Sequence, residues 1–589
     1  MSTASTHEAS PRINGIPPHD AARSSRQATP TPDIDRALDE LRAQADSWAN
    51  LPIRDRRAIL AELSRDLESV GARWAEAMRQ AEGLPAGEPR AGEEWLVGPY
   101  LIQRNLQLLD EALADIEKVG HPKVPGPVTE RPDGRVVAEV FPGRIYDRIF
   151  YPGVTAEVWM DRQVTKNGLA ATQARIYRET DHSGAIALVL GAGNVSSIGP
   201  TDALYKLFVE NQVVVYKLHE LNDHLGPLLG EAFQALIDWG VLRLVYGGAD
   251  VGAYLCAHDQ VDEIHITGSD KTVEAIVFGS GEEGARRKDA REPRLQKPIS
   301  SELGNVSPFI VVPGPWTRQE IDYHAENIVA SLTNNAGFNC NATRVIVLHR
   351  DWPQRTELVD AIRRHLAKTP TRTAYYPGAE DRHAAFVREH PEAERFGEPG
   401  PGELPWTLIP EVDAADKDDI AFHTEAFCGV FAVTLLDGEG AAGFLDRAVD
   451  FVNETLWGTL SASLAVHPAS LDVPAVRDAF ERALEGLRYG TIGVNCWAAV
   501  GFGLISTPWG AYPGHDLYDI QSGSGVVHNT LMFEHPEKVV IRAPFQMRPK
   551  PPWFPSHKTA LGLSKKLAAF EADPSPLRLP GILWTAIRA

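Results

Sequence analysis

The fold is decided by one stretch, Ile186 to Asn194, which reads IALVLGAGN. Its first five residues are an unbroken apolar run, as is typical of a strand buried on both faces of a parallel sheet. A glycine-bearing turn follows, and then a helical pattern from Pro200 to about Val209. A buried strand, a tight turn and a helix together predict the first unit of a doubly wound α/β sheet.

The same alternation repeats downstream. Strands are predicted at 213–216, 241–245 and 263–266, with a helix at 225–239 and another that follows Gly247–Gly252 and ends near His258 between them. Sheets of this kind bind ligands at the carboxyl ends of their strands. Polar side chains fall at these ends: Asn194, Lys217, Glu220, Thr267 and Ser269. We therefore expect a ligand site along this edge of the sheet.

A single cysteine stands in the polar run Asn334 to Arg344, which reads NNAGFNCNATR. Asparagines flank Cys340 on both sides, and Gly337 lets the backbone pass close to a neighbour. An exposed thiol near cationic groups or helix N-termini can ionise and act as a nucleophile. The other interpretation is that Cys340 is a small buried hydrophobe in a polar turn. The residues of this run leave both interpretations open.

Upstream, Glu302 stands before the apolar strand 309–312. The two boxes Glu302-Leu303-Gly304-Asn305 and Gly337-Phe338-Asn339-Cys340 together resemble the aldehyde dehydrogenase superfamily, whose pattern is Glu-Leu-Gly-Gly followed by Gly-x-x-Cys. Further segments resemble the boxes of that family and come in the same order: Ala192–Asn194, Lys217–Glu220, Ile266–Ser269, Glu425–Val430, Trp457–Ser463, Gly493–Asn495 and Pro508–Tyr512.

The resemblance implies an α/β fold of the aldehyde dehydrogenase type. It has two doubly wound Rossmann-like α/β domains and a small β oligomerisation element. The expected divisions are a disordered N-terminal extension (1–33), a cofactor-binding domain (34–299) and a catalytic domain (300–515). An oligomerisation strand region (516–545) and a C-terminal extension (546–589) follow, and interface strands are expected within about 130–175 of the cofactor-binding domain.

The resemblance also implies catalytic roles for three residues. Cys340 would attack an aldehyde as a thiolate. Asn194 and the backbone N–H of Cys340 would donate to the oxyanion. Glu302 would activate the water that hydrolyses the thioester. The implied function is NAD-dependent oxidation of a small-molecule aldehyde to a carboxylic acid. The alternatives are a CoA-acylating aldehyde dehydrogenase or acyl-CoA reductase, and a family member without catalytic activity.

Cofactor residues follow from the same boxes. Lys217 and Glu220 would reach the adenosine ribose. Glu425 would hold the nicotinamide ribose, Phe427 would flank the nicotinamide ring, and Gly191 opens the turn after the first strand. A carboxylate at 220 repels a 2′-phosphate, which favours NAD, although NADP stays possible.

The pyrophosphate would lie over the turn formed by Thr267, Gly268 and Ser269, at a helix N-terminus. The chain departs from the family at two points near this site. Ala192-Gly193 replaces the Pro-Trp of the first box, and Val273 replaces a glycine. Either departure is expected to change the pose of the cofactor.

Composition restricts the expected number of domains, the partners and the cellular compartment. The chain has 589 residues, enough for about two or three domains. A formal net charge of −21 argues against a nucleic-acid partner. The four cysteines lack metal-site spacing and indicate a reducing, cytoplasmic setting. There is no apolar run of the roughly 20 residues that a membrane span needs and no hydrophobic signal core at the N-terminus, so neither a membrane nor secretion is expected.

Several local expectations lie outside the boxes. A strand near Lys538 would be an unpaired edge in a monomer, which predicts a homodimer or homotetramer. Tyr146–Thr165 is expected to be extended, and Gly279–Glu292 to be a surface loop. Helices are predicted at 33–48, 53–71, 92–116, 323–332, 356–367 and 557–570.

Overall fold

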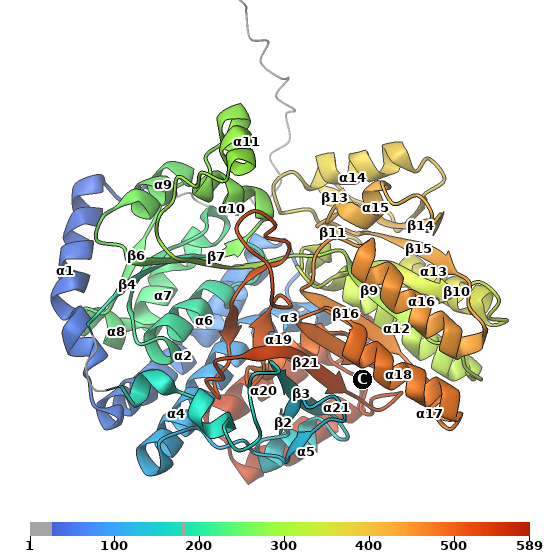
Figure 1. Cartoon of the computed structure of the whole chain (residues 1–589), viewed down its shortest axis with the longest axis horizontal. Coiled ribbons are helices and arrows are strands. Elements are labelled where there is room, and N and C mark those ends of the chain that lie inside the picture. Colours follow the sequence, from blue (N-terminus) through green and yellow to red (C-terminus); the bar gives the residue numbers. More distant parts are fainter. Residues whose placement is uncertain (1–25, 180–182) are drawn as a thin grey trace, which may run out of the picture.

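The computed structural model describes residues 26–179 and 183–589. Two α/β parts lie side by side, and three strands lie below and between them (Figure 1). These strands are β2 (Val136–Phe141), β3 (Thr155–Met160) and β21 (Pro536–Arg542). No helix among the described residues is long and apolar enough to cross a membrane.

The first part is built on a six-stranded sheet. Its order is β19-β8-β7-β4-β5-β6, and all strands are parallel except β19. The bounds are β4 (Ile186–Leu190), β5 (Val213–Lys217), β6 (Leu242–Val245), β7 (Glu263–Gly268), β8 (Ile299–Leu303) and β19 (Gly523–Ser524). The chain order reverses between β4 and β7, and this switch point is where such sheets bind ligands.

The second part is an eleven-stranded sheet, β1-β2-β3-β21-β17-β16-β9-β10-β15-β14-β12. The strands from β21 to β14 run parallel, whereas β1, β2, β3 and β12 pair antiparallel with their neighbours. The remaining bounds are β1 (Val128–Glu130), β9 (Ser307–Val311), β10 (Thr343–His349), β12 (Glu394–Phe396), β14 (Trp406–Val412), β15 (Val430–Leu436), β16 (Ser461–Ala465) and β17 (Thr491–Val494).

Helices cover both sheets. Strand β4 at the centre of the first sheet is fully buried beneath them, because it is an apolar run with no polar face. The helices that concern the site are α1 (Thr31–Ala49), α2 (Ile53–Ala81), α3 (Gly92–Trp95), α4 (Leu101–Val119), α5 (Ile145–Phe150), α6 (Ile198–Leu204), α9 (Ala249–Ala257), α10 (Asp270–Val277), α12 (Arg318–Thr333), α13 (Arg355–Lys368) and α19 (Ala499–Leu504).

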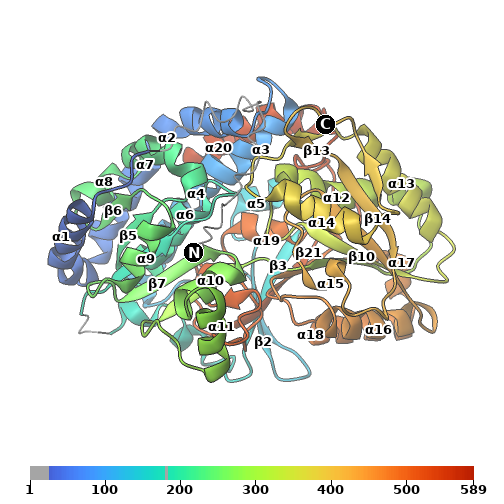
Figure 2. The same cartoon turned by 90° about the horizontal axis from the view of Figure 1, so that it is seen from above.

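The C-terminal extension forms two helices, α20 (Ala560–Ala572) and α21 (Leu579–Ile587). Helix α20 lies beside α3 and the π-helical turn η3 (Leu96–Tyr100), as Figure 2 shows from above. Phe570 of α20 also packs against α5, with its ring centroid 4.8 Å from that of Tyr146 and 5.0 Å from that of Phe150. The extension is therefore packed onto its own chain.

The predicted α/β fold and its main strands are confirmed, but the argument for oligomerisation is wrong. Strand β21 is paired on both sides within one chain, parallel to β17 and antiparallel to β3. It leaves no open edge that a second copy would have to cover. The homodimer or homotetramer stays a prediction without that reason.

Other corrections are local. The charged segment predicted as a loop forms α11 (Gly281–Ala290), where Glu283 pairs with Arg286 and Arg287 at helical spacing. The segment predicted as extended begins with α5. Strand β8 belongs to the first sheet, so the domain boundary lies after Leu303 rather than at 299.

The N-terminal extension also differs from the prediction where it is described. Arg26 donates its backbone N–H to Asp223, and Thr29 donates to the Tyr246 carbonyl, so this segment lies along the end of β6. Helix α1 already begins at Thr31. The predicted disorder of residues 1–25 lies outside the described residues.

Candidate active site

Cys340 lies in a tight turn between α12 and β10. The turn starts with three consecutive residues in the left-handed region: Asn335 with φ 50°, Ala336 with φ 53° and Gly337 with φ 83°. A Cβ at Gly337 would lie 2.7 Å from the carbonyl carbon of Cys428, so only glycine fits there. Non-glycine residues in this region store strain, which persists only where the surroundings hold it.

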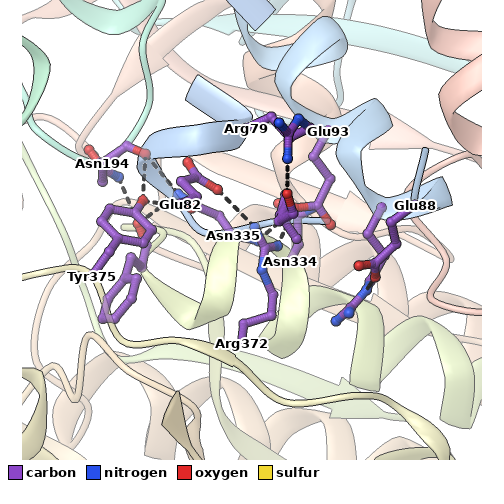
Figure 3. Close-up of polar contacts among 12 residues, drawn as sticks. Arg79, Glu82, Glu88, Glu93, Asn194, Asn334, Asn335, Arg372 and Tyr375 are labelled. Carbon is purple, nitrogen blue, oxygen red and sulfur yellow. Dashed lines mark hydrogen bonds and ion pairs between the residues drawn. The ribbon is translucent and has the colours of Figure 1, made fainter. Parts of the chain in front are cut away.

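A buried ion-pair cluster holds the start of this turn (Figure 3). The Glu93 carboxylate accepts the backbone N–H of Asn335 at 3.1 Å. The same carboxylate pairs with Arg372 at 2.5 Å, and Arg372 also pairs with Glu82 at 2.8 Å. All three charged side chains are nine-tenths or more buried. The segment from α2 to α3 therefore fixes a loop of the other α/β part.

Asn194 lies next to the turn that holds Cys340. Its side-chain Nδ2 donates to the Phe338 carbonyl at 2.8 Å. Its own carbonyl accepts from Asn335 Nδ2 at 2.8 Å and from the Tyr375 hydroxyl at 3.0 Å. An amide carries two N–H donors, so one remains to serve the cavity that Asn194 and Cys340 line together.

Glu302 is the second-last residue of strand β8, and its side chain is buried. Burial raises the pKa of this carboxyl to about 8, and the negative charge of Asp202 adds to the effect, while Trp509 and the Cys340 thiol act in the opposite direction. Burial and then the charges of Glu302 and Glu425 also raise the pKa of the Cys340 thiol well above its usual value. The two groups are close enough for their protons to be coupled.

Asp202 is a residue that the sequence did not single out. It is fully buried on α6, and its carboxylate accepts from the Thr267 hydroxyl at 2.9 Å. The His265 ring nitrogen Nε2 lies 3.5 Å from the same carboxylate. Thr267 thus faces inward to α6 and not outward to a cofactor. A lone acidic residue eight positions after Asn194 gives no motif by which it could have been found.

The strand ends place the expected ribose-binding residues together. Burial lowers the pKa of Lys217, which the carboxylates of Glu220, Asp250 and Asp223 partly offset. A Cβ at Gly248 would lie 3.3 Å from both Glu220 and Asp250. An acidic rim therefore surrounds one lysine at the ends of β5 and β6.

The pyrophosphate turn is only partly as expected. Gly268 and Ser269 are exposed, and the Ser269 hydroxyl caps α10 by accepting from the Thr272 backbone N–H at 3.2 Å. Val273 is buried on α10 and packs in the hydrophobic core, which absorbs this departure from glycine. A Cβ at Gly191 would lie 2.7 Å from the Tyr216 ring, so Gly191 makes room for that ring.

Glu425 lies against the backbone at Gly304, just after the last residue of β8. A Cβ at Gly304 would lie 2.2 Å from the carboxylate, so the acid rests directly on that backbone. Its Oε1 is buried with no hydrogen-bond partner among the described residues, and burial raises its pKa to about 8. A buried acceptor without a donor costs free energy unless a ligand hydroxyl supplies one. This observation fits a ribose.

Phe427, the other residue expected at the nicotinamide end, has an unusual backbone with φ 40°. Its ring packs 4.9 Å from Tyr376 and 5.9 Å from Phe338. Tyr376 in turn stands 6.1 Å from the His219 ring, so it links the two α/β parts. Sequence reasoning missed Tyr376 because a tyrosine in an irregular segment carries no pattern.

A cavity of about 200 Å³ opens onto Cys340 and Asn194. Most of its wall is aliphatic or aromatic, and it is shared among η3, α5, α19 and the C-terminal extension. The fold and the site together define a class: two α/β parts, with a cysteine and a carboxyl placed where a doubly wound sheet meets a second sheet.

Comparisons with known proteins agree with that class. The sequence profile described as "Aldehyde dehydrogenase family" matches residues 194–388. N-succinylglutamate 5-semialdehyde dehydrogenase from Sphingopyxis alaskensis is 32% identical over 28% of this chain and 31% of its own length. Aminoaldehyde dehydrogenase 1 from Pisum sativum is 26% identical over 46% of this chain and 50% of its own.

Among solved structures, glyceraldehyde-3-phosphate dehydrogenase GapN from Methanocaldococcus jannaschii, complexed with NADP, aligns with a TM-score of 0.59 at 16% identity. The alignment covers 88% of this chain and 96% of that one. A mutant of aldehyde dehydrogenase C from Pseudomonas syringae, in complex with NAD+ and octanal, aligns with a TM-score of 0.58 at 17% identity over 87% of this chain and 89% of that one.

Residues 194–388 thus match the aldehyde dehydrogenase family, and the curated relatives that the sequence matches are aldehyde dehydrogenases. The sequence matches span about a third to a half of the length of these curated relatives. The structural matches extend the shared fold over most of the chain.

Proposed function

We propose that this protein oxidises an aldehyde to a carboxylic acid with NAD as the electron acceptor. The observation that carries the proposal is the pairing of Glu302 with Cys340, a buried carboxyl with a pKa of about 8 beside a thiol at the end of a cavity. A carboxyl tuned to near-neutral pH is suited to take and give protons.

The chain supplies the covalent chemistry. Glu302 takes the thiol proton, and the Cys340 sulfur attacks the aldehyde carbon to form a hemithioacetal. The Asn194 amide and the Cys340 backbone N–H stabilise its oxyanion. NAD, when bound, supplies the hydride acceptor, and a thioester remains on the sulfur. Glu302 releases the thiol proton to solvent and then takes a proton from water, whose oxygen attacks the thioester carbon. The carbon–sulfur bond breaks, the acid is freed, and the Cys340 sulfur regains the proton from Glu302.

The residues present fit NAD. Glu425 offers a buried acceptor without a donor, which a ribose hydroxyl would supply. The acidic rim around Lys217 would repel a 2′-phosphate, which favours NAD over NADP. Ser269 and Gly268 at the start of α10 would bind the pyrophosphate at a helix N-terminus.

The test is NADH formation with a panel of aldehydes, with and without CoA. We expect turnover without CoA. Cys340→Ala should abolish it, and Glu302→Gln should lower steady-state turnover by about 10²-fold or more. Full activity of Cys340→Ala would refute the proposal. Turnover only with CoA would assign the protein to the acylating class, and failure to bind NAD would indicate a member without catalytic activity.

A further inference from the structure

The cavity at Cys340 has one polar end and an apolar body. Its polar groups gather near the Cys340 sulfur and are asparagine side chains, among them that of Asn194. Away from this end the wall is made of leucine, isoleucine, valine, proline and aromatic rings. A site that must bind a charged or hydroxylated chain would need convergent donors or a counter-ion along its body.

The two charged residues on the wall are already neutralised by the protein. Glu93 pairs with Arg372 at 2.5 Å and accepts the Asn335 N–H. Lys550 pairs with Glu326 at 2.9 Å and donates to Ser556 at 2.6 Å. A substrate charge in this cavity would lose its hydration without gaining a partner, and such burial is costly.

The C-terminal extension supplies one side of the cavity. The Pro-rich run after β21 contributes Pro551, Pro552 and Trp553, and α20 contributes Leu563 and Leu567. Helix α21 adds Ile582, Leu583 and Ala586. Facing them are Leu96, Val97 and Tyr100 of η3 and Phe150 of α5. This wall exists only because the extension folds back over its own active site.

We infer that the substrate is an uncharged, apolar aldehyde of medium length, and that the C-terminal extension forms the pocket for its hydrocarbon tail. A 150 Å³ apolar cavity holds benzene. By proportion, a cavity of about 200 Å³ holds about eight carbon-sized atoms. The carbonyl would lie at Cys340 and the tail against α20 and α21. That the bound molecule is a substrate rests on the proposed function, but the apolar pocket itself can be tested without turnover.

The kinetic test compares straight-chain aldehydes from propanal to dodecanal with charged aldehydes that carry a carboxylate or an ammonium group. Each buried methylene should raise kcat/KM roughly four-fold. The rise should stop near eight carbons, and the charged aldehydes should be poor substrates. A flat profile, or a preference for a charged aldehyde, would overturn the inference.

A wall variant locates the effect. Leu567→Trp should fill the pocket and lower kcat/KM for octanal at least tenfold more than it lowers kcat/KM for propanal, and its midpoint of thermal unfolding shows that the variant folds. Leu577→Trp is the matched control, because Leu577 belongs to the same extension but is 91% exposed and does not line the cavity. Equal losses for both aldehydes in Leu567→Trp, or equal effects in both variants, would overturn the role of the extension.

A second readout does not depend on catalysis. The rate at which iodoacetamide alkylates Cys340, followed by mass spectrometry, should fall in the presence of 1-octanol but not of 1-propanol. Leu567→Trp should lose this protection and Leu577→Trp should keep it. Protection without turnover of any aldehyde would refute the proposed function and leave the pocket standing. Turnover without chain-length dependence or protection would refute the pocket alone.

Discussion

Glu302 and Cys340 face each other in a buried space. The charge of Glu302 makes the Cys340 thiol harder to ionise, whereas burial and the charge of Asp202, not the thiol, make Glu302 harder to ionise. A carboxyl with a pKa near 8 is mostly protonated at neutral pH, and its ionised fraction grows as the pH rises through that value. Since a general base works in its ionised form, the structure favours activity on the alkaline side of neutrality.

The first prediction is therefore a pH profile. For the wild-type protein, kcat/KM should rise with pH and level off above an apparent pKa near 8, which belongs to the coupled pair. In Glu302→Gln this rise of kcat/KM with pH should change or disappear. Glu283→Gln, a change on the exposed face of α11, should leave the rise in place. Steady-state rates across the pH range measure it. A rise near pH 4 would contradict the burial of this carboxyl.

Asp202 gives a second prediction at the same scale. Its negative charge is the largest contribution after burial to the raised pKa of Glu302. Asp202→Asn keeps an oxygen for the Thr267 hydroxyl but removes the charge. The pKa of Glu302 should fall, so the rise of kcat/KM should move to lower pH. The shift is read from the same profile. An unchanged rise would mean that the two carboxyl groups do not interact.

At the scale of elements, the turn that holds Cys340 depends on a segment almost 250 positions earlier. Glu93 holds the Asn335 amide and neutralises Arg372, and both contacts are buried. The Glu93 carboxylate is thus one of the buried contacts that hold the left-handed backbone at Asn335 and Ala336. We regard Glu93 as a positioning residue, since the structure gives it no contact with the reacting sulfur.

Glu93→Gln should lower the free energy of unfolding by about 3–5 kcal/mol, because Arg372 loses half of its buried pairing. Displacement of the turn should also lower kcat by about 10²-fold and alter the rate of Cys340 alkylation. The half-exposed pair Arg363–Glu394 is the control, and Glu394→Gln should cost about 1 kcal/mol or less. Urea unfolding and alkylation measure both. Loss of stability with an unaltered alkylation rate would make Glu93 merely structural.

The sequence predicted elements well where their signal is local. The strands from Ile186 onward are apolar runs between glycine-bearing turns, and the structure confirms them. The helix α11 was missed because its glycines and charges are typical of a loop, although its Glu–Arg pairs stabilise a helix. The boxes identified Cys340 and Glu302 but not Asp202 or Glu93, whose importance depends on contacts across the chain that no spacing reveals.

At the scale of the whole molecule, one chain completes its own large sheet. The strands at its two edges, β1 and β12, are only three residues long each, and short edges offer little for another chain to pair with. The resemblance had suggested an edge strand that needs a second copy, and no local pattern could show that β3 and β17 would cover β21 from both sides.

Folding should therefore not require a partner. The midpoint of thermal unfolding should stay constant over a hundredfold range of protein concentration, because an obligate dimer would gain stability by mass action. Scanning calorimetry or dye-based melting at several concentrations measures it. A midpoint that climbs with concentration would show that contacts between copies stabilise the fold.

The place of β21 in that sheet has a consequence for biosynthesis. Strand β3 leaves the ribosome near residue 160, but its partner β21 ends at Arg542, after nine-tenths of the chain has been translated. Until then the β2–β3 hairpin exposes an unpaired apolar edge. Such late, long-range strand pairing is slow and leaves intermediates open to aggregation. Nascent chains that stop short of β21 should thus depend on chaperones, and slow translation over the last fifty residues should matter little.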